Sequence, residues 1–358
     1  MGAKLTYPKL ALLALAAAAV IAALERFIQP QPGGTLLLTM VMFLGIAEGC
    51  VALMAAAEIA HGGWHLPMRS RMLAAQAMIP VVGLLFVVQS LRLEIYPWFA
   101  SNGFWLNRDF FIARHLVLIA LVFLAARKFT ADALRGLDSR RLWAVIYALL
   151  FVIHQTVIGI EWVMSLERPW FSTLFGAFFM VSALLSGITT GAIVLFFWRG
   201  RFDDKLRLAQ KSIGGLMFGF ATFWAYFYFS QLIVIWYGNL PEEVGYLAKR
   251  IGYHTPYWAV ARLAFGLIWV IPFAVLLRRK NKTNPWVTMA LAFTILTGFL
   301  LEKGLMIHPV APVHPVAVLL ELGIAGFLFV AIMRGGEALL PGRGAAPVES
   351  AAASSVTN

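Results

Sequence analysis

The chain has 358 residues, of which 61% are hydrophobic and only 13% are charged. Soluble domains average about 25% charged residues, so this composition excludes an ordinary soluble protein and predicts an all-α, polytopic integral membrane protein. The single cysteine, Cys50, lies in an apolar run, which excludes a disulfide framework, a thiolate zinc site and a cysteine-ligated iron–sulfur cluster.

About ten apolar segments are long enough to cross a bilayer, which takes roughly 20 helical residues. We expect them at 8–28, 34–60, 71–93, 108–129, 141–165, 170–198, 210–237, 255–277, 285–305 and 313–333. The first segment resembles the apolar core of a signal peptide, because Lys4 and Lys9 precede an alanine-rich run. A retained first helix fits the topology better than cleavage does. We therefore predict one transmembrane domain over residues 1–335.

The net charge of +12 follows a topological pattern. Basic clusters follow the second, fourth, sixth and eighth segments, whereas the loops between them, such as EIYPWFASNGFW, carry little excess positive charge. The positive-inside rule therefore predicts that both termini are cytoplasmic and that the basic residues contact anionic lipid, not nucleic acid. Residues 336–358 are rich in Ala, Pro, Gly and Ser, which predicts a disordered cytoplasmic tail.

Aromatic residues crowd the loops on the predicted external side, in EIYPWFASNGFW and YGNLPEEVGYLAKRIGYHTPYW. They fit the aromatic belt found at membrane–water interfaces. They also fit a docking surface for an extracytoplasmic protein, since aromatic residues are enriched at protein interfaces.

The chain carries an internal repeat. The fourth segment reads FFIARHLVLIALVFLAARK and the eighth reads YWAVARLAFGLIWVIPFAVLLRRK, so each has an Arg near its external start and a basic cluster at its exit. The pattern predicts two four-helix bundles, helices 2–5 (residues 34–165) and helices 6–9 (residues 170–305), with the first and tenth helices outside them. Chance similarity among apolar helices is the alternative.

Ionisable residues within the apolar segments need a reason, because each costs roughly 2.5–3.5 kcal/mol near the bilayer centre. The candidates for a proton pathway are Glu48, Glu58, His154, Glu161, Tyr226 and Glu302. The candidate buried charge partners are Arg114, His115, Arg262, Lys303 and Glu321.

We expect two ion pairs, Glu161 with Arg114 in the first bundle and Glu302 with Arg262 in the second. Each could be a structural lock, because a buried pair offsets both desolvation costs. Alternatively, the groups could form a proton relay or a quinol site. In support of a relay, Glu58, Glu48, His154 and Glu161 follow one another nearly across the membrane.

The histidines do not predict a haem. A membrane b-type haem needs two His at matching depth on different helices, and His115 and His154 differ in height by roughly 7 Å. No nucleotide-binding glycine loop is present either. We expect no catalytic residue, no bound metal and no bound cofactor in this chain.

The stretch IEWVMSLERPWFSTLFG, residues 160–176, resembles the signature of the ActF subunits of bacterial alternative complex III, a quinol:electron acceptor oxidoreductase. The stretches FWAYFYFSQLIVIWYGNLPEE, FWLNRDFFIAR, WVIPFAVLLRRKNK and RSRMLAAQAMIP are similar to other helices of that family. The resemblance covers roughly residues 35 to 335. Where the family has Pro-His before the Trp, this chain has Arg168-Pro169, so no histidine role carries over.

The resemblance implies a subunit of the bacterial inner membrane, distantly related to the polysulphide-reductase-like (NrfD) subunits, that conducts protons or couples them to quinol oxidation. It implies no redox cofactor in this chain, although quinol could bind. Haem c and iron–sulfur clusters would lie in partner subunits. The implied partners are an NrfD-like quinol-oxidising subunit, a multihaem cytochrome c subunit, an iron–sulfur subunit and small anchored subunits. The alternatives are a stand-alone secondary transporter and a purely structural membrane anchor.

Overall fold

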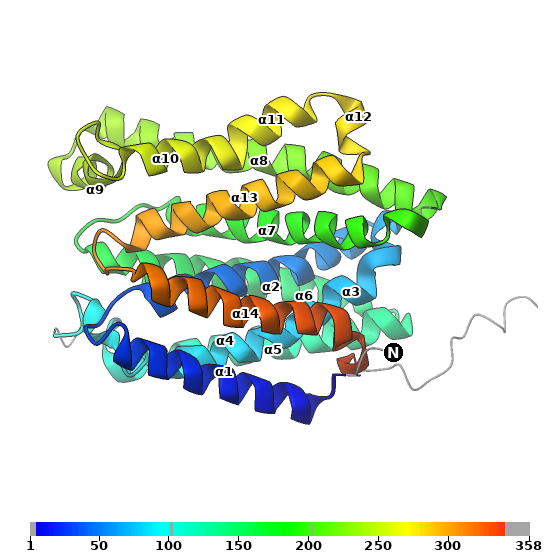
Figure 1. Ribbon diagram of the computed structural model, residues 1–358, viewed down its shortest axis with the longest axis horizontal. Coiled ribbons are helices and arrows are strands. Elements are labelled where there is room, and N and C mark those ends of the chain that lie inside the picture. The colour runs from blue at the N-terminus through cyan, green and yellow to red at the C-terminus, as the bar shows by residue number, and fades with distance from the viewer. Residues whose placement is uncertain (1–4, 101–102, 202, 341–358) are drawn as a thin grey trace, which may run out of the picture.

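The computed structural model describes residues 5–100, 103–201 and 203–340, which form helices and connecting loops without a β-strand among them (Figure 1). Ten stretches of this described part are long and apolar enough to cross a membrane, which confirms the predicted all-α, multi-pass class. They are Tyr7–Phe27, Thr35–Ile59, Gly63–Gln89, Arg108–Arg135, Arg140–Glu167, Phe175–Phe197, Asp204–Gly238, Trp258–Leu276, Pro285–Ile307 and Pro315–Gly335.

Several of these stretches contain more than one helix. The α-helices are α1 (Tyr7–Phe27), α2 (Thr35–Ile59), α3 (Arg69–Ala74), α4 (Ile79–Gln89), α5 (Arg108–Arg135), α6 (Arg140–Ile158), α7 (Phe175–Phe197), α8 (Asp204–Gly238), α9 (Pro241–Ile251), α10 (Trp258–Phe265), α11 (Ile271–Leu276), α12 (Arg279–Lys282), α13 (Pro285–Ile307) and α14 (Pro315–Gly335). Short π-helical segments at Gly159–Val163 and Gly266–Val270 extend α6 and join α10 to α11.

The transmembrane helices pack as two rings. In the first ring α2 contacts α4 and α6, and α5 closes the ring by contacting the same two helices. In the second ring α7 contacts α8 and α13, while the α10–α11 stretch lies against both α8 and α13. The two rings follow the same order along the chain, as the internal repeat predicts. α1 and α14 contact each other outside the rings, and Figure 1 shows α1 along the lower edge of the molecule.

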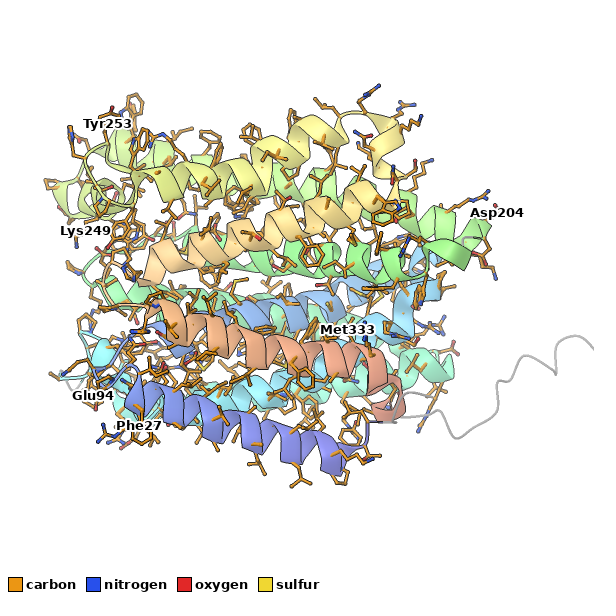
Figure 2. All side chains as sticks on the ribbon, in the orientation of Figure 1. Phe27, Glu94, Asp204, Lys249, Tyr253 and Met333 are labelled. Carbon is orange, nitrogen blue, oxygen red and sulfur yellow. The ribbon has the colours of Figure 1, made fainter. Side chains whose placement is uncertain are left out.

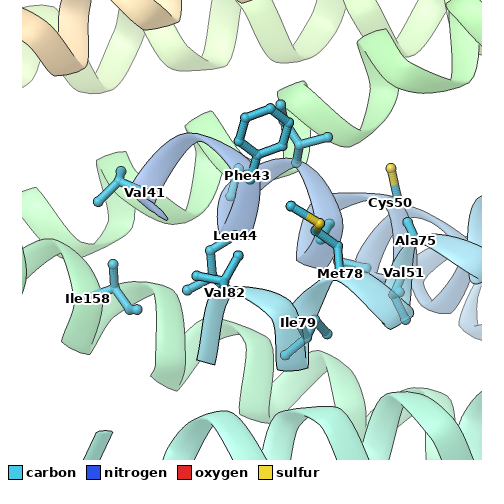
Figure 3. Close-up of a cluster of buried hydrophobic side chains, with 14 of the residues drawn as sticks. Val41, Phe43, Leu44, Cys50, Val51, Ala75, Met78, Ile79, Val82 and Ile158 are labelled. Carbon is cyan, nitrogen blue, oxygen red and sulfur yellow. The ribbon is translucent and has the colours of Figure 1, made fainter. Parts of the chain in front are cut away.

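The helices α2 and α7 form the centre of the molecule. Both are apolar on every side, and most of their residues are buried. A helix without a polar face is buried on all sides, which explains this position. Figure 3 shows Phe43, Leu44 and Val51 of α2 packed near Met78 and Val82.

Glycines bring the backbones of α2 and α7 together. A Cβ added at Gly49 would lie 1.9 Å from the carbonyl oxygen of Ala183, and one added at Gly187 would lie 2.2 Å from the carbonyl carbon of Gly49. Such spacing of small residues is the usual route to close packing of transmembrane helices, where the surrounding lipid gives no hydrophobic driving force. The two rings therefore meet through backbone contact.

The two ends of the molecule differ. We call the end with the loops joining α1–α2, α4–α5, α6–α7, α8–α10 and α13–α14 the loop-rich end, and the opposite end the basic end. Figure 2 shows Lys249 and Tyr253 at the loop-rich end and Asp204 at the basic end. The Tyr7 hydroxyl donates a 2.6 Å hydrogen bond to the carbonyl of Leu339, so both described chain ends lie together at the basic end.

The predicted tail is described only at its start. Gly336–Leu339 forms a short 3-10 helix, and Leu339 and Leu340 are buried. The rest of the tail, residues 341–358, lies outside the described residues, so its disorder stays a prediction.

The glycine contact gives a direct test of the central packing. Gly49→Ala should force α2 and α7 apart and lower the free energy of unfolding by about 1–3 kcal/mol, the usual cost of overpacking. Gly45→Ala is the matched control, since its added Cβ would meet Ala183 only at 3.6 Å. Thermal unfolding in detergent would compare the two. Equal melting temperatures would contradict the close contact.

Candidate functional site

A fully buried polar cluster centres on Glu48, near the middle of α2. Its Oε1 lies 2.7 Å from Nδ1 of His154, and its Oε2 accepts a 2.8 Å hydrogen bond from the amide of Gln155. The hydroxyl of Tyr147 donates to the backbone carbonyl of Glu48 at 3.0 Å. Glu48 and His154 are both fully buried, so the structure joins two predicted site residues within the first ring.

His154 has one ring nitrogen in use and one open. Nδ1 meets Glu48, whereas the buried Nε2 has no hydrogen-bond partner among the described residues. A buried polar atom without a partner is uncommon in proteins and needs an explanation. An imidazole held on one side by a carboxylate and open on the other can accept a proton and pass it on.

The second cluster surrounds Glu161 in the π segment Gly159–Val163. Its Oε1 accepts from the indole of Trp105 at 2.9 Å, and its Oε2 pairs with the guanidinium of Arg114. Nε2 of His115 also reaches Oε2, at 3.0 Å. The predicted Glu161–Arg114 pair is confirmed. Because both carboxylate oxygens are fully engaged, this cluster has the character of a structural lock.

His115 is buried and oriented from both sides. Its Nδ1 accepts a 3.1 Å hydrogen bond from the indole of Trp162, which leaves the ring proton on Nε2, where it faces Glu161. Trp162 in turn stacks on Phe86 with ring centroids 5.2 Å apart. Both imidazole nitrogens of His115 are occupied, so neither is available as a haem ligand in this arrangement.

Glu58 forms a separate cluster at the basic end. Nε of Arg140 donates to its Oε1 at 2.6 Å, and Nε2 of His65 lies 3.3 Å from its Oε2. These residues line an open polar cavity of about 390 Å³. Ten residues separate Glu58 from Glu48 on α2, which is about 15 Å of helix filled with apolar side chains. The predicted series from Glu58 to Glu161 is thus three separate clusters.

In the second ring, the expected Glu302–Arg262 pair is wrong. Glu302 pairs with the adjacent Lys303 at 3.0 Å and accepts from the indole of Trp224 at 3.1 Å. Arg262 is exposed, and its guanidinium lies over the ring of Trp258, 3.6 Å from the centroid. The sequence placed Arg262 at the right depth but could not say that its side of the helix faces outward.

Tyr226 is also displaced from the expected pathway. Its side chain is 62% exposed on the outer face of α8, where it lies beside Phe223. Tyr228, two residues on, faces inward and lines a cavity of about 80 Å³ together with Trp224 and Glu302. This volume is well below the roughly 300–1,000 Å³ of typical small-molecule sites, so the cavity as it stands suits water better than a quinol.

The turn SLERPW joins the two rings at the loop-rich end. Glu167 pairs with Arg250 and, at 2.7 Å, with Lys249 on α9, and Trp170 stacks on Tyr246 with centroids 3.5 Å apart. This turn follows the first ring, whereas α9 lies within the second. The turn therefore ties the first ring to the second at the loop-rich end.

A cluster that the sequence analysis identified only in part includes Glu321 of α14. Glu321 is buried against Thr39 of α2 and Glu25 of α1, and Glu25 pairs with Arg92 at 2.5 Å. Glu25 stands near the end of an apolar run, which was a usable signal. Arg92 and Gln155 carried no sequence signal, because a single polar residue at a helix end or on a helix face is common.

Comparisons with known proteins do not assign the chain to a family. No protein-family model matches the chain, and no curated protein matches it. The chain is thus a multi-pass helical membrane protein whose site rests on its own geometry.

The Glu161 cluster predicts unequal effects for two arginines that look equivalent in the repeat. Arg114→Gln leaves a buried carboxylate without its cation, which typically costs about 3–5 kcal/mol. Arg262→Gln removes only an exposed contact with Trp258 and should change the stability little. Thermal unfolding of both variants in the same detergent checks this. A loss of stability confined to Arg262→Gln would contradict the assigned pairings.

Proposed function

We propose that this chain is a cofactor-free membrane subunit of a respiratory quinol:electron acceptor oxidoreductase of the alternative complex III type. Its first ring would carry protons between the membrane interior and the loop-rich end. The observation that carries the proposal is the Glu48–His154 pair. Both groups are fully buried near the middle of a membrane span, and one imidazole nitrogen is left open. The motif resemblance supplies the class of complex.

The chemistry of the pair suits proton transfer. Ionisable groups in the membrane interior are expensive and typically mark proton relays or ion pathways. Glu48 can hold a proton on a carboxyl oxygen, and His154 can accept it at Nδ1 while releasing another from Nε2. Nε2 of His154 has no hydrogen-bond partner among the described residues, so it is the atom from which a proton could leave the pair.

The Glu161 cluster would act as the boundary of this path. His154 and Glu161 belong to the same span, Arg140–Glu167, and are seven residues apart. Glu161 itself accepts from Trp105, Arg114 and His115. This saturation favours an anchoring role for Glu161, which separates it in function from Glu48.

The orientation follows from charge. The basic clusters fall at the basic end, so the positive-inside rule puts that end in the cytoplasm and the loop-rich end outside. In a bacterium the membrane would be the inner membrane, and a quinol oxidised there would release its protons toward the loop-rich end.

The loop-rich end offers surfaces for partner subunits. Phe104 is 90% exposed, and Trp236, Tyr237 and Tyr253 are largely exposed around α9. Large apolar rings at a water-facing end fit either the interfacial belt or docking of a protein. We assign this end to the implied cytochrome c and iron–sulfur subunits, and the ring surfaces to an NrfD-like sister subunit and small anchored subunits.

A stand-alone transporter is the less favoured function. Transporters built from repeats interrupt equivalent helices in both halves. Here one π segment ends the fourth span of the first ring, whereas the other divides the third span of the second ring. The interruptions are therefore not equivalent.

Purification from the native membrane tests the proposal. The tagged chain, extracted in mild detergent, should carry with it haem c proteins visible in a reduced-minus-oxidised spectrum and an iron–sulfur protein identified by mass spectrometry. A colourless chain purified without such subunits would overturn the assignment.

Turnover of the assembled complex tests the role of Glu48. Glu48→Gln should assemble normally but lower quinol oxidation per complex on the order of 10²-fold, as expected when a positioned proton-transfer group is removed. Tyr226→Phe is the matched control, because Tyr226 is exposed and should leave turnover unchanged. Normal turnover in the fully assembled Glu48→Gln complex would contradict the proposal and would show that Glu48 has only a structural role.

A further inference from the structure

Two carboxyl groups lie together outside both rings, where α1 and α14 contact each other near the loop-rich end. Glu25 of α1 is 2% exposed and Glu321 of α14 is fully buried. Neither residue belongs to the clusters of the first ring described above. Two buried acids at one place need a compensating charge, a proton or both.

One of the two acids is paired with a cation. Oε2 of Glu25 lies 2.5 Å from Nη1 of Arg92. The same guanidinium donates to the backbone carbonyls of Glu25, Gln29 and Gln31, so four acceptors hold it in place. A guanidinium held this firmly is a fixed positive charge, and it neutralises the carboxylate of Glu25.

The other acid has no cation. Oε2 of Glu321 accepts a 3.1 Å hydrogen bond from the hydroxyl of Thr39, which is neutral. The helices around the pair add no further buried charge among the described residues: α4 has no ionisable residue, and those of α2 and α3 lie nearer the membrane middle or the basic end. Arg26, next to Glu25 on α1, is exposed, and Nδ1 of His314 at the start of α14 accepts from the backbone N–H of Ala317. Three groups thus face one another, two carboxyls and one guanidinium.

The remaining oxygens complete the arrangement. Oε1 of Glu25 and Oε1 of Glu321 are buried, and neither accepts from any described N–H or O–H donor. The two side chains lie within interaction distance of each other, and Arg92 acts on both. One guanidinium can neutralise only one of two buried carboxylates, so we expect the other acid to hold a proton.

We propose that Glu25 and Glu321 form a proton-binding site that holds one proton, carried by Glu321 and donated from its Oε1 to Oε1 of Glu25. The bound proton makes the group of three electrically neutral. It also ties α1 to α14, the two helices that stand outside the rings. Loss of the proton would leave two carboxylates in contact and weaken that tie. Arg92, at the mouth of the site, reaches the surface loop at Gln31 and marks its exit to the loop-rich end.

Infrared difference spectroscopy of the purified full chain in lipid nanodiscs tests this site without any partner or quinol. Raising the pH of the wild type should remove a carbonyl band of a protonated carboxylic acid and release a proton. Glu321→Gln should lack that band and release one proton fewer per molecule. Its amide can still donate to Oε1 of Glu25, so the fold should hold. Glu94→Gln, an exposed acid beside Arg92, is the control and should match the wild type.

A second variant tests the assignment independently of Glu321. Thr39→Val removes the donor that favours the charged form of Glu321, so the band should persist to higher pH than in the wild type. The melting temperature of the wild type should also fall as the proton is lost, since the folded chain binds more protons than the unfolded one there. An unchanged band in Glu321→Gln, or an unshifted one in Thr39→Val, would overturn the proposal. Neither result depends on the function proposed for Glu48.

Discussion

The backbone contact between α2 and α7 sets where the polar groups of the first ring can lie. Gly49 faces Gly187 so closely that no side chain fits between the two helices. Successive helical residues are about 100° apart, so the neighbouring Glu48 turns away from α7 and toward α6. There it meets His154 and Gln155. The short stretch Gly45 to Gly49 therefore determines both the contact between the two rings and the position of the buried carboxyl group of Glu48.

The buried charges share one principle, because lipid offers no solvation and each charged group must find its partner within the protein. Most pairs join two segments: Glu161 joins α5 to the end of α6, Glu58 joins α2 to α6, and Glu167 joins the first ring to α9. They differ in how completely they are satisfied. Glu161 is saturated and suits a lock, whereas the Glu48–His154 pair has an open nitrogen and suits transfer.

Composition and charge spacing were sufficient to predict the ten spans and the two four-helix units, because lipid requires long apolar helices and the repeat sets their grouping. Depth along a helix was also readable, because Glu48 and His154, which were expected to be neighbours in the proton pathway, are found in contact. The direction in which a side chain points was not readable. Arg262 and Tyr226 have the right depth but face outward, since in lipid-facing helices apolar residues occupy every side and leave no amphipathic signal. Glu25 and Arg92 pair only through the tertiary packing of α1.

The central claim is that the Glu48–His154 pair carries protons and is not merely a structural bond. Proton release per electron, measured with the assembled complex reconstituted in vesicles, tests it most directly. The account predicts that Glu48→Gln lowers this ratio even at matched electron-transfer rates, while the tightly paired Glu161 cluster remains intact. An unchanged ratio in Glu48→Gln would contradict the account and leave the pair as a structural contact between α2 and α6.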